Sequence, residues 1–188
     1  VMGSLPGTRM KPKGVLSVDD SLLTHYGQEF EQIAKLFDPA TGTYVWAHNL
    51  VTIHYSDDLT DYPLLFRLWQ PVDLEKLEQG LRAAGIPLKA DKEVWKVTDP
   101  RKWRSYLLGV WQRRQKSHPE IRELYDSKLL IAQDLLQQWV EAHPDWKLPV
   151  TFDDWYTQPA FCQFLDQTLG LPYVGTLSGS DKVNLRTG

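Results

Sequence analysis

The chain has 188 residues, of which 42% are hydrophobic, and a formal net charge of −3. This length and hydrophobic content predict a globular domain with a core of its own. The charge neither favours nor excludes nucleic acid, because acids at the centre of a site and bases at its rim cancel in the sum. The single cysteine, Cys162, excludes an internal disulfide and a thiolate metal cluster and fits a reducing cytoplasm. No apolar run approaches about 18 residues, so we expect no membrane span.

The first part of the chain is predicted to be mainly strand. Residues 1–13 are rich in Gly, Pro and Lys and are predicted to form an unpacked leader. Apolar residues at i, i+3, i+4 and i+7 within 30–37 predict a short helix. Alternating apolar residues and β-branched or aromatic side chains predict strands at 14–21, 43–55 and 62–69, of which the last two form a hairpin.

Helical patterns dominate the middle of the chain. A cap at Asp73 predicts a helix that ends before Gly85, and Asp99-Pro100 opens another. A third and longer helix begins near Pro119, carries an apolar stripe as far as Trp139 and ends before His143. The predicted elements from here to the end of the chain are helices at 74–84, 100–116 and 119–142, a strand at 150–152, a helix at 159–169 and a strand at 173–177.

Two matching runs, 14–21 and 149–156, each consist of an apolar strand-like segment that ends in two acids. A buried strand that ends in carboxylates delivers negative charge to the rim of a sheet, where α/β proteins bind their ligands. Two such ends side by side would hold several carboxylate oxygens close together, an arrangement that suits Mg²⁺ or Mn²⁺ and phosphate chemistry. The alternative is ordinary turn chemistry and helix capping by Asp.

Four stretches carry a family resemblance: Leu16–Ser21, Thr43–Val51, Phe152–Tyr156 and Leu171–Gly175. Together they resemble the bacterial insertion-sequence transposases of the DDE family, in its IS4/IS701-like branch. The likeness runs from about Gly14 to Leu177, which is most of the chain. It implies an α/β fold of the RNase H-like type, with a mixed sheet of three antiparallel strands followed by parallel strands and flanked by helices.

The same resemblance assigns the acids. In such enzymes the first catalytic Asp closes the first strand in an Asp-x-Ser/Thr pattern, which maps to Asp19, and the second closes the fourth strand, which maps to Asp153. Both would bind Mg²⁺ or Mn²⁺, with Asp20 and Asp154 as second choices. Because side chains alternate along a strand, we expect Asp20 and Asp154 to face solvent or to cap helices. The first and fourth strands are neighbours in this fold, which would bring Asp19 and Asp153 together.

The resemblance also implies an activity and its partners. Residues 14–188 would form part of a transposase catalytic domain, and the full-length protein would cleave and transfer DNA strands at transposon ends. Transposon-end and target DNA are then the partners, a homodimer is the assembly, and the bacterial cytoplasm, near the nucleoid, is the location.

The third carboxylate of such enzymes is a Glu on a helix after the fifth strand, and no acid follows Asp181 here. We therefore expect the triad to be incomplete in this chain, the chain to be a piece of a longer protein, and the chain alone not to cleave DNA. Two alternatives stay open. One is a catalytically inactive remnant with the same fold, and the other is a non-enzymatic binding module that uses the eight Trp and eight Tyr residues.

A basic cluster lies in the predicted helix at 100–116. Six of the 21 Lys and Arg residues fall within 16 positions. They either form a solvated helix face or contact DNA phosphates without reading sequence. The six residues are Arg101, Lys102, Arg104, Arg113, Arg114 and Lys116.

Overall fold

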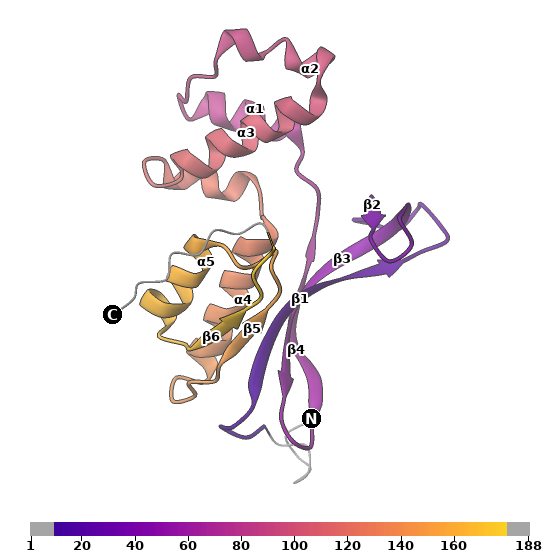
Figure 1. Ribbon diagram of the computed structural model, residues 1–188. Coiled ribbons are helices and arrows are strands. Elements are labelled where there is room, and N and C mark those ends of the chain that lie inside the picture. The colour runs from indigo at the N-terminus through magenta and orange to yellow at the C-terminus, as the bar shows by residue number, and fades with distance from the viewer. Residues whose placement is uncertain (1–9, 180–188) are drawn as a thin grey trace. The chain divides into compact units, whose positions relative to one another are not determined.

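The computed structural model describes residues 10–179 of the chain. These residues divide into two compact units, the first made of 10–69 with 128–179 and the second of 70–127 (Figure 1). Most of the predicted leader therefore lies outside the described residues, as does Asp181.

A six-stranded mixed sheet forms the first unit. The strand order is β2-β3-β1-β5-β6, and β4 also pairs with β3. Strand β3 is antiparallel to β1, β2 and β4, whereas β5 is parallel to both β1 and β6. The prediction of an RNase H-like mixed sheet flanked by helices is confirmed, with β2 as an additional antiparallel strand. The strands are β1 (Val15–Thr24), β2 (Ala34–Asp38), β3 (Thr43–Ser56), β4 (Asp61–Trp69), β5 (Val150–Phe152) and β6 (Tyr173–Gly175).

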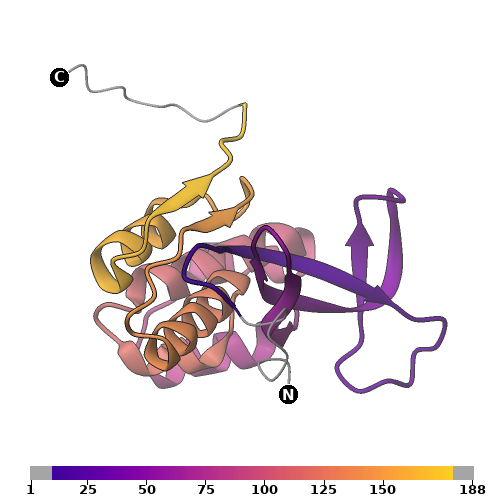
Figure 2. The ribbon, with the colours of Figure 1, turned by 90° about the horizontal axis from the view of Figure 1, so that it is seen from below.

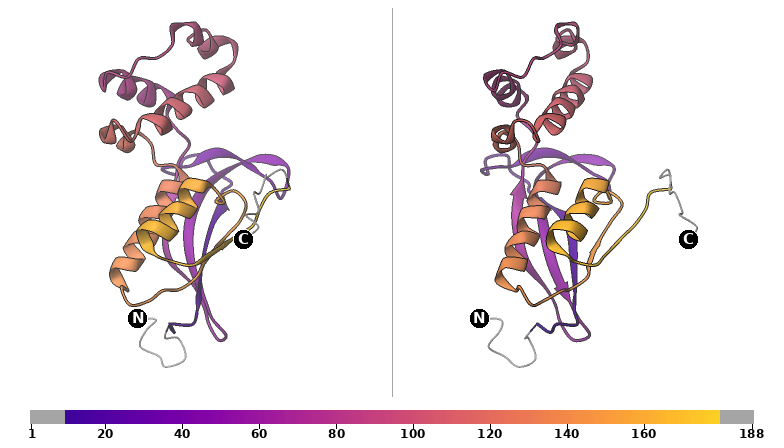
Figure 3. Two further views of the ribbon diagram at one scale, coloured as in Figure 1. Left: turned by 60° about the vertical axis from the view of Figure 1, so that its left-hand side comes forward. Right: turned by 90° about the vertical axis from the view of Figure 1, so that its left-hand side faces the viewer.

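Two helical segments cover one face of this sheet. Helix α4 (Lys128–Ala142) and helix α5 (Pro159–Gln163), which continues as a π-helix at Phe164–Leu169, lie side by side on that face (Figure 3). Because side chains alternate along a strand, every second residue of the central strands points under these helices. The buried strand residues of this core are Leu16, Val18, Val51, Ile53, Tyr55, Val150 and Phe152.

The two central antiparallel strands extend well beyond their parallel neighbour. Strand β1 pairs with β3 along its whole length, from Val15 to Thr24, whereas β5 pairs with β1 only at Leu16–Val18. The far ends of β1 and β3, together with β2, form an arm that projects from the rest of the sheet (Figure 2). The acid pair at 19–20 therefore lies in the middle of β1, at the point where its parallel partner ends.

The second unit is helical. Its core includes Leu77, Leu107 and Trp111, and the indole N–H of Trp111 donates to the carbonyl of Ile121 at 2.8 Å. Helix α1 begins at an Asp73 cap whose side chain accepts two backbone N–H bonds, as the sequence predicts. The helices are α1 (Leu74–Ala83), a 3-10 turn at Ala90–Lys92, α2 (Trp95–Thr98), α3 (Pro100–Arg114) and a 3-10 helix at Pro119–Leu124.

Two predicted helices are wrong. The helical spacing at 30–37 is coincidental, because β2 pairs there with β3 and buries Leu36 between exposed neighbours, a strand pattern of period two. Gln32, with a φ of 61°, breaks any helix before it. The long helix predicted at 119–142 is interrupted, because Tyr125 has an extended backbone. The apolar stripe that predicted it is divided between the two units.

The first strand also does not end at its acids, as the sequence suggested. Pairing with the 14-residue β3 carries β1 on to Thr24. The reason is that a long antiparallel partner supplies backbone hydrogen bonds past the acids, which local sequence does not reveal.

Candidate active site

The two predicted catalytic acids sit on neighbouring parallel strands. Val18 of β1 is in register with Phe152 of β5, and Asp19 and Asp153 are the next residue of each strand. Neighbouring strands lie about 4.8 Å apart, so Asp19 within β1 and Asp153 just past the end of β5 lie side by side. Ser17 and Thr151 lie two positions before these acids, on the same face of the sheet. Their hydroxyls form a hydrogen bond of 3.0 Å that links the two strands.

Each of these acids uses one carboxylate oxygen locally. Asp19 Oδ1 accepts the backbone N–H of Asp20 at 2.7 Å. Asp153 Oδ1 accepts the backbone N–H groups of Trp155 at 3.1 Å and Tyr156 at 3.3 Å, a turn that folds the chain back behind β5. Within residues 10–179, Oδ2 of each acid has no hydrogen-bond partner, so one oxygen of each remains available to a ligand.

The acids influence one another electrostatically. Partial burial raises the pKa of Asp19, the backbone N–H of Asp20 lowers it, and the negative charges of Asp20 and Asp153 raise it further. Burial, together with the charges of Asp20, Asp19 and Asp153, raises the pKa of Tyr156 as well. The negative charges of Asp20 and Asp153 thus lie close enough to Asp19 to disfavour its ionised form, and a bound cation would relieve this repulsion.

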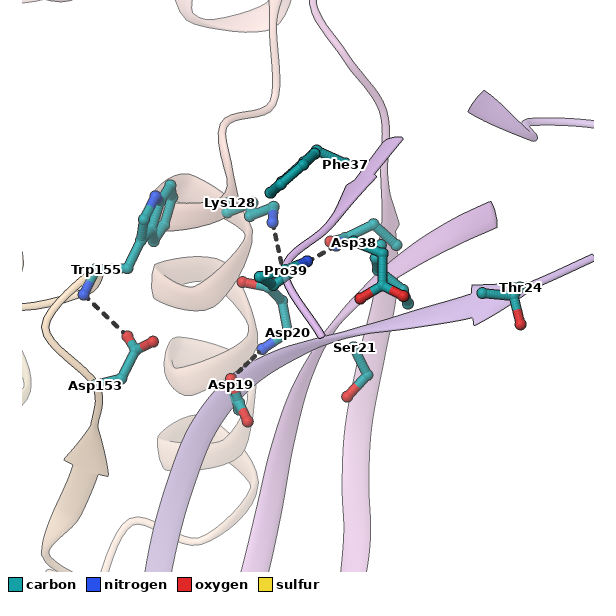
Figure 4. A pocket seen from close by; sticks show the side chains of 12 residues that line it. Asp19, Asp20, Ser21, Thr24, Phe37, Asp38, Pro39, Lys128, Asp153 and Trp155 are labelled. Atoms are coloured by element: carbon teal, nitrogen blue, oxygen red, sulfur yellow. Dashed lines mark hydrogen bonds and ion pairs between the residues drawn. The ribbon is translucent and has the colours of Figure 1, made fainter. Parts of the chain in front are cut away.

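An open pocket lies over these carboxylates (Figure 4). The three acids Asp19, Asp20 and Asp153 form one part of its lining, and Lys128 and Trp155 form another. Figure 4 shows Asp153 beside Trp155 and Lys128 above Asp20. The remaining lining residues are Ser21, Leu22, Thr24, Phe37, Asp38, Pro39 and Asn49.

A comparison with family models matches residues 5–186 to the family described as DDE superfamily endonuclease. The chain belongs to this family. Membership indicates nuclease- or transposase-type activity on DNA, and endonucleases of this superfamily generally use divalent metals. A comparison with curated proteins finds no match.

The described residues of this endonuclease domain fit a divalent metal through two carboxylates. Asp19 and Asp153 would hold the ion, because Mg²⁺ and Mn²⁺ prefer carboxylate oxygens and each of these two acids keeps one oxygen without a hydrogen-bond partner among residues 10–179. Within residues 10–179, no group of three or more His, Cys, Asp or Glu side chains converges as a metal site. In the same residues, no helix is long and apolar enough to cross a membrane.

The two second-choice acids differ from each other. Asp20 does not face solvent as expected, because it lies on the helix-covered face of β1 and forms an ion pair with Lys128 at 2.6 Å. Asp154 is exposed, as expected, in the turn behind β5. Lys128 and Asn49 carry no local signal in the sequence that would predict a place at the site, whereas Trp155 and Tyr156 follow the predicted acids directly.

The six basic residues of the predicted cluster are all exposed. Helix α3 buries Trp103, Leu107, Val110 and Trp111 on its opposite face, as the spacing predicts. Lys102 pairs with Asp99 at 3.0 Å. The cluster therefore presents charge to solvent on the second unit, whereas the acids belong to the first.

Proposed function

We propose that this chain supplies two of the metal-binding carboxylates of a transposase that cleaves and transfers DNA strands at transposon ends, in the IS4/IS701-like branch of the family. The observation that carries the proposal is the position of Asp19 and Asp153, one residue beyond paired positions of two parallel strands. Catalytic and metal-binding roles for both residues follow from it. A homodimer is the assembly that we propose for handling two transposon ends.

The chemistry needs charge stabilisation and positioning. A bound Mg²⁺ or Mn²⁺ would lower the pKa of the attacking oxygen and stabilise the leaving oxygen. The chain's own contribution is to hold the acids in place before the substrate arrives. The backbone N–H groups of Asp20, Trp155 and Tyr156 do this by fixing one oxygen of each carboxylate. Such preorganised placement is the main source of catalysis in phosphoryl transfer.

Calorimetry with Mn²⁺ tests the proposed site. Because only two carboxylates converge in the described residues, we expect weak binding that Asp19→Asn reduces by at least about tenfold, or 1.4 kcal/mol. Asp154→Asn is the matched control, since it removes the same charge from an exposed neighbour of Asp153 and should leave the affinity within about twofold.

The outcomes separate the candidate functions. Equal binding by parent and Asp19→Asn would place the ion elsewhere and remove the basis of the proposed function. No Mn²⁺ binding by the parent would instead favour a catalytically inactive remnant. Seven of the eight Trp residues, all of which lie within 10–179, are buried or half-buried, and this disfavours an aromatic binding module built on Trp.

A further inference from the structure

We propose that Asp20 is a positioning residue for the metal site: through Tyr156 it fixes the turn that carries Asp153 relative to Asp19. This inference rests on the proposed function, since it assigns Asp19 and Asp153 as the ligands. It gives Asp20 a task different from metal binding, although it is the chain neighbour of Asp19. The two side chains alternate across β1, so one carboxylate can point to the ligand and the next to the core.

The Asp20 carboxylate accepts hydrogen bonds from three separate parts of the first unit. Lys128 at the start of α4 donates at 2.6 Å, the Asn49 amide of β3 at 2.9 Å, and the Tyr156 hydroxyl behind β5 at 3.4 Å. These partners are 108, 29 and 136 residues from Asp20 in the chain. One side chain in the middle of β1 therefore joins α4, β3 and the turn after β5.

Tyr156 transmits this anchoring to Asp153. Its side chain is fully buried, so its ring cannot move without repacking the core around it. At one end its hydroxyl reaches Asp20, and at the other its backbone N–H donates to Asp153 Oδ1. The path from Asp20 to Asp153 thus consists of two hydrogen bonds and one immobile side chain.

Lys128 makes the partial burial of Asp20 tolerable. Its side chain is 15% exposed and that of Asp20 is 22% exposed, so each charge needs the other. The ammonium also lies 4.9 Å from the ring centre of Trp69 and 5.5 Å from that of Trp155, which restricts its position. A carboxylate held by this cation is neutralised and less available to a metal ion than Asp19.

The orientation of the Asn49 side chain supports the positioning role of Asp20. Its side chain is 3% exposed, and its Oδ1 is buried without a hydrogen-bond partner among residues 10–179. Because an ionised carboxylate only accepts, the amide has to turn its N–H groups toward Asp20, which leaves the oxygen unpaired. An unpaired buried acceptor lowers the stability of the folded state. The Asn49 amide is therefore oriented as a donor to Asp20.

Tyr156→Phe tests the inference without changing any charge. The ring and its packing remain, but the hydroxyl that reaches Asp20 is lost. We expect Mn²⁺ affinity to fall about threefold to tenfold, in line with the loss of one hydrogen bond that holds the site. Ser17→Ala is the control, because it removes a hydrogen bond between β1 and β5 that involves neither Asp20 nor the turn after β5. Its affinity should stay within about twofold of the parent.

A double-mutant cycle distinguishes a positioning role of Asp20 from a merely structural one. In an Asp20→Ala background, Tyr156→Phe should have no further effect on Mn²⁺ affinity, because both changes break the same link. All titrations are made well below the melting temperature of each variant, so that folded protein is compared with folded protein. If Asp20→Ala does not fold, the comparison of Tyr156→Phe with Ser17→Ala decides alone.

Two results would overturn the inference, and they differ from failure of the proposed function. One is an affinity of Tyr156→Phe equal to that of Ser17→Ala. The other is an undiminished effect of Tyr156→Phe in the Asp20→Ala background. If instead Asp19→Asn leaves Mn²⁺ binding unchanged, the assignment of the metal ligands fails first, and the measurement identifies that failure separately.

Discussion

At the scale of single residues, the surroundings of an Asp side chain decide whether its pKa is raised or lowered. Partial burial and two neighbouring negative charges raise the pKa of Asp19. Asp57, in the turn between β3 and β4, accepts hydrogen bonds from the Tyr55 hydroxyl and from backbone N–H groups, which hold its pKa well below its usual range. The first environment favours binding of a cation, and the second favours a stable turn.

Asp57 predicts how stability depends on pH. Because its pKa is lower in the folded protein than in the unfolded chain, its contribution is present above about pH 4 and is lost as the pH falls below that value. Asp57→Asn should therefore show a flatter loss of stability between about pH 4 and pH 2 in urea unfolding measurements.

Asp58→Asn is the matched control for this measurement. Asp58 lies in the same turn, and its side chain is 77% exposed beside Lys11, so its contribution should be small. Equal pH profiles for the parent and Asp57→Asn would show that the Tyr55–Asp57 hydrogen bond does not stabilise the folded state.

At the scale of secondary structure elements, helix α3 has an apolar face and a basic face. Its aromatic and aliphatic residues are buried within the second unit, so its cations project into solvent. If three or four of them contact phosphates, the affinity for duplex DNA should fall with salt with a log–log slope of about −3.

Replacing Arg101, Lys102 and Arg104 together by Gln should flatten that slope and leave the fold intact, because exposed substitutions usually cost little stability. A matched triple variant replaces Lys35, Lys76 and Lys89 by Gln, which removes the same charge from exposed positions outside α3. Titration of labelled duplex at several salt concentrations measures both. Identical slopes in the two variants would assign the α3 cluster to a solvated face.

At the scale of the whole molecule, the number of converging carboxylates limits the chemistry. Residues 10–179 bring together two acids on parallel strands but no group of three or more metal-ligating side chains. Two carboxylates hold a second metal ion poorly, and phosphoryl transfer depends on that placement. We therefore expect no Mn²⁺-dependent nicking when the purified chain is incubated with supercoiled plasmid.

Nicking that requires Mn²⁺ and disappears in Asp153→Ala would contradict this expectation and would show that the two acids suffice. Nicking that persists in that variant would point to a contaminating nuclease. The parent and Asp154→Asn, prepared in the same way, serve as references.

Much of this protein follows from its sequence alone. The β-branched and aromatic runs correctly predicted β3 and β4, and the capping Asp73 and Asp99 correctly predicted where α1 and α3 begin. These features depend on local periodicity and on side chains that bond to nearby backbone, so no distant contact is needed to read them. The matched acid runs indicated the pairs at 19–20 and 153–154 for the same reason, whereas the family resemblance selected Asp19 and Asp153 within them.

Only the tertiary structure decided how those acids are supported. The continuation of β1 past Asp19 depends on pairing with β3, and the strand at 34–38 depends on the same partner rather than on its own spacing. Lys128 and Asn49 contact Asp20 although 108 and 29 residues of chain separate them from it, and no sequence motif predicts these contacts. Local patterns determine which elements form, whereas the choice between a solvent-facing and a buried, ion-paired Asp20 depends on which distant groups the folded sheet brings to it.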